Sequence, residues 1–164
     1  METETLITLV PNTGDAIEVP RRIACVSKLV SSMLDILEDE EPVIPLPNLD
    51  GAVLKKIIKF CEHHVDDVVD PNERPFRNKN SYLIEEFDQK LLDVPQEELR
   101  AIGVGADYLN IKALFDTAAK AIAHRIRGKP LEEIKRILGV EEFGDLTSQI
   151  ENEHREFMKG KKLF

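Results

Sequence analysis

The feature that most constrains this chain is a change in the spacing of its apolar residues. Residues 6–10 and 16–19 are two short apolar, partly β-branched runs separated by the turn-forming residues 12–15 (NTGD). This arrangement predicts a β-hairpin that ends at Pro20. From Ser27 onward, apolar residues recur mainly three and four positions apart, which indicates amphipathic helices. Strands followed by helices indicate an α+β fold.

Two helices and one extended segment are predicted between residues 27 and 64. Ser27 is suited to cap the first helix, and Asn48 or Asp50 the second. Between them, the extended segment 43–47 contains two prolines, which suits the edge of a sheet. The predicted apolar faces are Leu29, Val30, Met33, Leu34 and Leu37 on the first helix, and Val53, Leu54, Ile57, Ile58 and Cys61 on the second.

Residues 65–82 form a polar, proline-containing connection, and helices are expected from there on. Asp93 and Gln96 resemble a capping box, while residues 103–105 (GVG) predict a helix interruption. Asn110 is expected to open a long helix.

Gly128 is expected to close that long helix, with Pro130 at the first position of the next one. We predict a domain at residues 1–126 and a C-terminal module at 127–164 that contains helices 130–139 and 147–158. These last two helices have apolar faces and few neighbouring elements. Either they fold back on the α+β domain, or a partner completes them.

Charge and composition exclude several classes of partner. The formal net charge is -9, from 31 acidic and 22 basic side chains. Such a surface repels phosphate backbones and anionic lipids, so we expect neither nucleic acid nor a membrane as partner. No apolar run approaches the roughly 20 residues of a membrane span, and the N-terminus lacks the pattern of a signal peptide. The two cysteines, without a disulfide framework, suggest a reducing compartment, the cytoplasm and nucleus.

Cys61, His63 and His64 are the residues that suggest a metal or a nucleophile. This C-x-H-H cluster offers at most three ligands, and no second Cys/His pair exists in the sequence. Cys61 also belongs to the apolar face of its helix, where cysteine behaves as a small hydrophobe. We therefore expect a core residue, with no catalytic residues, no metal and no cofactor, and a protein that is not an enzyme.

Several segments resemble the Skp family of adaptors in SCF ubiquitin ligases. Residues 43–49 (VIPLPNL) and 54–67 (LKKIIKFCEHHVDD) are similar to that family's PLPN…LKKVIxWCxHHxDD pattern. Residues 106–116 (ADYLNIKALFD) are similar to its AANYLDIKGLLD, and residues 126–135 (IRGKPLEEIK) to its IKGKTPEEIRK. The resemblance covers nearly the whole chain in the same order.

The resemblance implies a BTB/POZ-like domain followed by C-terminal helices that dock an F-box protein. It implies that Asp107 and Tyr108 contact the N-terminal domain of a cullin. The residues it assigns to the F-box side are Ile134, Ile137, Leu138, Val140, Phe143 and Phe157. Exposed apolar faces also favour self-association of the chain when no partner is bound.

The chain departs from the family pattern at several positions. Phenylalanines occupy three tryptophan positions, Phe60, Phe87 and Phe157, and Asp107 replaces an asparagine. Two further hypotheses accompany the ligase adaptor. One, motivated by Asp107 and by the glycines Gly103 and Gly105, is a scaffold that binds F-box or other partners outside a ligase, in a chromosomal or kinetochore assembly. The other is an enzyme or metal protein built on Cys61 and His63.

Overall fold

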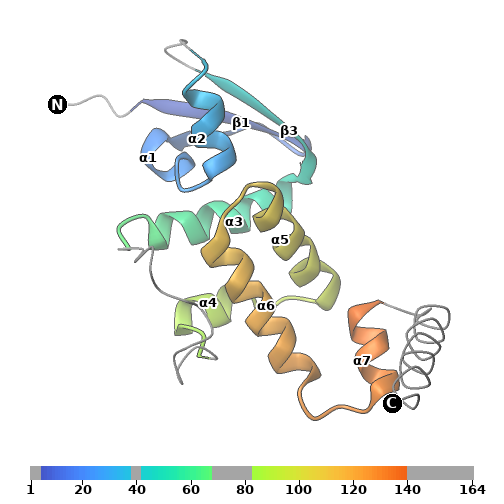
Figure 1. Ribbon diagram of the computed structural model, residues 1–164. Coiled ribbons are helices and arrows are strands. Elements are labelled where there is room, and N and C mark those ends of the chain that lie inside the picture. Colours follow the sequence, from blue (N-terminus) through green and yellow to red (C-terminus); the bar gives the residue numbers. More distant parts are fainter. Residues whose placement is uncertain (1–4, 38–41, 68–82, 140–164) are drawn as a thin grey trace, which may run out of the picture. The chain divides into compact units, whose positions relative to one another are not determined.

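The computed structural model describes residues 5–37, 42–67 and 83–139. The chain divides into two compact units between His124 and Arg125. The first unit carries a three-stranded sheet and six helices among its described residues (Figure 1), which agrees with the predicted α+β class. The expected helix at 147–158 and most of the connection at 65–82 lie outside the described residues.

The sheet has the strand order β2-β1-β3. Strands β1 (Leu6–Thr13) and β2 (Ile17–Pro20) pair antiparallel, which confirms the predicted hairpin. Strand β3 (Val43–Asp50) lies parallel to β1 at the sheet edge, as its prolines predict.

A shift in the register of β3 sets the start of the next helix. Leu9 lies opposite Ile44, but farther along Thr13 lies opposite Asp50, so β3 carries extra residues between these pairs. The Thr13 hydroxyl donates a hydrogen bond to the Asp50 carboxylate, whose other oxygen accepts from the backbone N–H of Ala52 at 2.8 Å. These bonds, that from Thr13 first, lower the pKa of Asp50. Asp50 therefore caps helix α3.

The core of the first unit lies where α3 (Gly51–His64) meets the sheet and the later helices. Helices α1 (Arg21–Ala24) and α2 (Lys28–Leu34) lie close to the sheet, while α3 packs against α5 (Gln96–Tyr108) (Figure 1). Helix α4 (Glu86–Leu91) and most of α6 (Lys112–Ile126), as far as His124, complete the unit. The largest fully buried side chains include Phe60, Ile44, Leu54, Ile57, Leu99 and Leu114.

Helix α7 (Leu131–Leu138) belongs to the second unit. Gly128 and Gly139 have φ values of 75° and 65° and follow α6 and α7, so the predicted helix ends are confirmed. Pro130 lies one position earlier than predicted: it is the N-cap residue of α7.

Three local predictions are wrong. Helix α5 runs through Gly103 and Gly105 without a break, because tertiary packing fills the space beside it. A Cβ on Gly105 would lie 2.7 Å from Leu49 Cδ1 and 2.9 Å from Ile57 Cδ1. No capping box forms either, since α5 starts directly after Pro95, which makes no side-chain cap. Finally, α6 begins at Lys112 and not at Asn110.

Two serines, Ser27 at the N-cap of α2 and Ser32 within it, allow a matched test of tertiary anchoring. Buried Ser27 accepts a hydrogen bond from Val30 N–H at 3.2 Å and donates one to the distant Leu109 carbonyl at 2.6 Å. Exposed Ser32 donates only to Lys28 within its own helix. We expect Ser27→Ala to lower the free energy of unfolding by about 1.5–3 kcal/mol, because the helix cap and the buried hydrogen bond to the Leu109 carbonyl are both lost. Ser32→Ala should change it by less than about 0.5 kcal/mol. Urea denaturation measures both, and equal effects would contradict the anchoring role.

Two glycines should respond to alanine with opposite signs. A Cβ on Gly51 would lie 2.4 Å from the Thr13 carbonyl oxygen, a backbone atom held in the sheet. A Cβ on Gly103 would meet Ala118 Cβ at an ordinary 3.7 Å. Gly51→Ala should therefore destabilise the chain by about 1–3 kcal/mol, whereas Gly103→Ala should stabilise it by roughly 0.5–1 kcal/mol. Thermal and urea denaturation of both variants test this, and a stable Gly51→Ala chain would contradict it.

Candidate protein interaction surfaces and a histidine cluster

The corner between α5 and α6 carries the two residues predicted to contact a cullin. At this corner Leu109 N–H donates to the Gly105 carbonyl at 2.9 Å, and Ile111 N–H donates to the Ala106 carbonyl at the same distance. Asn110 has a φ of 54°, a left-handed conformation that asparagine tolerates better than most residues. The chain therefore reverses direction here, and α6 begins at Lys112 rather than at Asn110.

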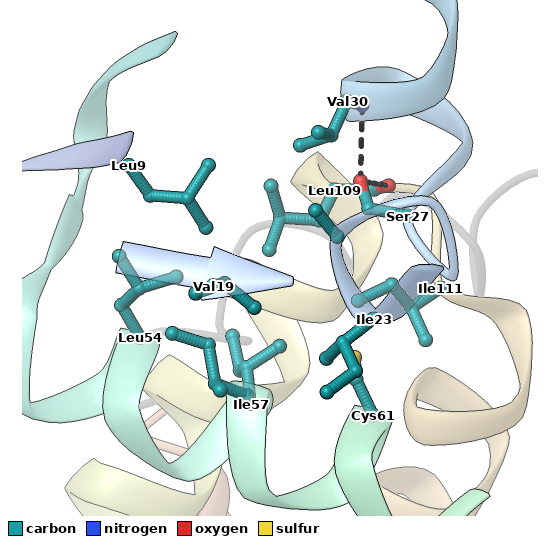
Figure 2. Close-up of a pocket in the computed structure, with 12 residues that line it drawn as sticks. Leu9, Val19, Ile23, Ser27, Val30, Leu54, Ile57, Cys61, Leu109 and Ile111 are labelled. Carbon is teal, nitrogen blue, oxygen red and sulfur yellow. Dashed lines mark hydrogen bonds between the residues drawn. The ribbon is translucent and has the colours of Figure 1, made fainter. Parts of the chain in front are cut away.

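The start of α2 holds this corner in place. The Leu109 carbonyl accepts from the Ser27 hydroxyl and, at 3.4 Å, from the Leu29 N–H. Figure 2 shows Ser27 between Leu109 and Val30, with its hydrogen bond to the Val30 backbone. Because Ser27 and Leu109 are both buried, these bonds are shielded from water. The last turn of α5 is thus fixed relative to α2.

Asp107 and Tyr108 lie in this fixed last turn. Asp107 is exposed, whereas Tyr108 is half-buried and packs against the core. A partly exposed tyrosine on a rigid element is a suitable anchor for a protein interface, because little side-chain entropy is lost on binding. Their contact with a cullin stays a prediction.

Helix α7 carries the described part of the predicted F-box surface. None of its residues is fully buried: Ile134, Ile137 and Leu138 are half-buried, and Leu131 is 64% exposed. On the polar side, Lys135 pairs with Glu132 at 3.2 Å, and Lys129, just before the helix, pairs with Glu133 at 2.6 Å. The helix is therefore strongly amphipathic. Val140, Phe143 and Phe157 lie outside the described residues.

A small cavity lies between the sheet, α1, α2 and α3, and is lined almost entirely by apolar side chains. Its volume is about 20 Å³. Figure 2 shows Leu9, Val19, Leu54, Ile57 and Leu109 around it. This is room for about one water molecule, and Ser27, its polar lining residue, already uses its hydroxyl in hydrogen bonds. The cavity is a packing defect of the core rather than a ligand site.

Cys61 is a core residue, as predicted. Its side chain lines the same cavity, and the residue is 5% exposed (Figure 2). Burial, with a smaller contribution from the negative charge of Glu62, raises the pKa of the thiol to about 12. Since only the thiolate is a good nucleophile or metal ligand, Cys61 is suited to neither role.

His63 and His64 instead meet residues from beyond the 65–82 connection. His63 Nε2 lies 3.1 Å from Glu85 Oε1, and His64 Nε2 lies 2.9 Å from Asp88 Oδ1. The other ring nitrogen of His64, Nδ1, bonds to the Asp67 carboxylate. Among the described residues, His63, His64 and Glu85 form a group whose ligand atoms all lie within 4.8 Å of one another.

The carboxylates around His64 set its charge. Burial lowers the pKa of His64, but the hydrogen bonds and charges of Asp88 and Asp67 together outweigh burial and raise it above its usual value. Asp88 is itself buried, and its hydrogen bond to His64 links α4 to the end of α3. Sequence reasoning singled out both histidines but missed Glu85 and Asp88, because only the tertiary fold brings α4 to this end of α3.

The difference between the two cysteines can be measured directly. Cys25 is partly exposed, while Cys61 is buried with a strongly raised pKa. At about pH 8 we expect a disulfide reagent such as 5,5′-dithiobis(2-nitrobenzoate) to modify one thiol of the native chain rapidly, and the second only after unfolding. Cys25→Ser should abolish the fast reaction, and Cys61→Ser should preserve it. Loss of the fast reaction in Cys61→Ser would overturn this assignment.

Comparison with known families identifies the chain. The family model described as "Skp1 family, tetramerisation domain" matches residues 5–66, which contain the sheet and α1 to α3. The model described as "Skp1 family, dimerisation domain" matches residues 112–156, which begin at α6. The chain belongs to the Skp1 family. The first match also supports the BTB/POZ-like fold that the resemblance implied.

Curated relatives extend the match over most of the chain. The "E3 ubiquitin ligase complex SCF subunit sconC" of Neosartorya fischeri is 37% identical over 151 residues, covering 92% of this chain and 94% of its own length. A protein of the same name from Aspergillus fumigatus shows the same identity and coverage. The one from Arthroderma benhamiae is 37% identical over 150 residues, which is 91% of this chain and 90% of that protein.

Proposed function

We propose that this chain is a non-catalytic adaptor that joins an F-box substrate receptor to a cullin in an SCF-type E3 ubiquitin ligase. The observation that carries the proposal is the 37% identity, over nearly the full length, to proteins named as SCF subunits. Two parts of the chain with no residue in common support the proposal: the last turn of α5 with Asp107 and Tyr108, and the apolar side of α7. Among the described residues, no helix is both long and apolar enough to span a membrane.

The activity of such an adaptor is positional. It brings a substrate receptor and a ligase scaffold into one complex, which raises the effective concentration of substrate near the ubiquitin-charged enzyme. On the cullin side, Tyr108 supplies a half-buried aromatic anchor, with the exposed carboxylate of Asp107 beside it. On the F-box side, Ile134, Ile137 and Leu138 supply aliphatic area, and we assign Val140, Phe143 and Phe157 to the same surface.

We also propose that the chain works in the cytoplasm and nucleus. Cys25 and Cys61 are both free thiols, which suits a reducing compartment. A fluorescent fusion confined to a secretory organelle would contradict this assignment.

Assembly of a ternary complex tests the adaptor proposal. The chain is mixed with a cullin N-terminal domain, with and without an F-box segment, and complexes are measured by size exclusion with light scattering and by calorimetry. We expect Tyr108→Ala to weaken cullin binding about tenfold or more and to leave F-box binding unchanged, because the half-buried aromatic anchor is lost. Leu83→Ala, at an apolar side chain that is 69% exposed, is the matched control.

On α7, Ile134→Glu should weaken F-box binding about tenfold or more, because it places a charge on the apolar face. Arg136→Glu introduces the same charge at an exposed position and should bind nearly as the wild type does. Failure to bind any F-box segment would refute the adaptor proposal. An F-box complex that never recruits a cullin would instead favour a scaffold outside a ligase, in a chromosomal or kinetochore assembly.

A further inference from the structure

We propose that His63, His64 and Glu85 form a binding site for one divalent transition-metal ion of the zinc class. The site joins the end of α3 to the residue that caps α4, and these two helices are in contact. It replaces the metal hypothesis based on Cys61 and departs from the expectation of no metal. It does not depend on the adaptor function.

The positions of the donor atoms are the first support. Zinc binds imidazole nitrogen at about 2.0–2.1 Å and carboxylate oxygen at about 2.0–2.2 Å, so ligand atoms in a tetrahedral site lie about 3.4 Å apart. His63 Nε2 and Glu85 Oε1 are already 3.1 Å apart. All three ligand atoms lie within 4.8 Å of one another, so side-chain adjustments of roughly an ångström close the site.

The surroundings of the two rings are the second support. His64 has a carboxylate at each ring nitrogen, Asp67 at Nδ1 and Asp88 at Nε2. Whichever nitrogen binds the ion, the other keeps a carboxylate acceptor, and this arrangement orients metal-binding histidines and increases their basicity. The His63 ring stacks on Phe87, with centroids 3.8 Å apart and planes 14° apart. His64 contacts Phe60, with centroids 4.3 Å apart.

The local charge also favours a cation. The carboxylates of Asp67, Asp88 and Glu85 surround the two histidines, and the C-terminal end of α3 adds the negative pole of its helix dipole. Two imidazoles and one carboxylate are a donor set for zinc, copper or nickel rather than for magnesium or calcium. With three protein ligands, the ion keeps one position for water.

Zinc titration of the metal-free chain tests the site. Untagged protein is treated with a chelator and titrated with zinc chloride at about pH 8 by calorimetry, with cobalt(II) absorption as a second readout. We expect one ion per chain, with a rise in the thermal midpoint as zinc is added. His63→Gln and Glu85→Gln should each weaken binding at least tenfold, and both residues are exposed enough to be replaced without unfolding the chain. His124→Gln, at an exposed histidine at the end of α6, should bind zinc as the wild type does.

Three results would overturn the proposal. The first is the absence of saturable binding at zinc concentrations up to about 1 mM. The second is equal affinity in the wild type and in His63→Gln, which would place the ion elsewhere in the chain. The third is zinc-dependent dimerisation on size exclusion with half an ion per chain, which would place the ion between molecules.

Discussion

The buried hydroxyl of Ser27 ties the start of α2 to the last turn of α5, which carries the proposed cullin contacts. Its oxygen caps α2, and its proton goes to the carbonyl of Leu109, a residue 82 positions later in the sequence. The interior around it is apolar, so replacing these hydrogen bonds by bonds to water is unfavourable. The position of the Leu109 carbonyl relative to α2 is therefore well defined. The last turn of α5, with Asp107 and Tyr108, is thereby held against the start of α2. A surface intended to recognise another protein gains from such rigidity, because less entropy is lost on binding.

The C-terminal end of α3 is held by charged groups, whereas the corner at Ser27 is held by a neutral hydroxyl. His64 is flanked by Asp67 and Asp88, and His63 by Glu85. Histidine–carboxylate contacts therefore help to join α4 to α3, beside the stacking of His63 on Phe87. Such contacts are formed by groups that also bind metals, which is why a structural junction and a metal site are compatible here. The thiol of Cys61, whose pKa burial raises to about 12, supplies no nucleophile here.

Sequence reasoning succeeded where the signal is local. The hairpin, the edge position of β3 and the cap at Ser27 each follow from a few neighbouring residues, and the structure confirms all three. It failed where the outcome depends on distant packing. Two glycines predicted a break in α5, yet Leu49 and Ile57 from β3 and α3 fill the space beside Gly105 and keep the helix continuous. Glu85 and Asp88 were missed as partners of the histidines, because nothing in their own neighbourhood indicates a partner more than 20 residues away.

The sequence by itself therefore determined the class of fold, the membership of the Skp1 family and the amphipathic character of α7, since these depend on periodicity and on matches along the chain. The tertiary structure alone decided that His63 and His64 meet the carboxylates of Glu85 and Asp88. It also decided that Tyr108 is half-buried beside an exposed Asp107. The physical reason is that burial, hydrogen bonding and the pKa of a side chain depend on the groups that surround it in space, and those groups come from distant parts of the sequence.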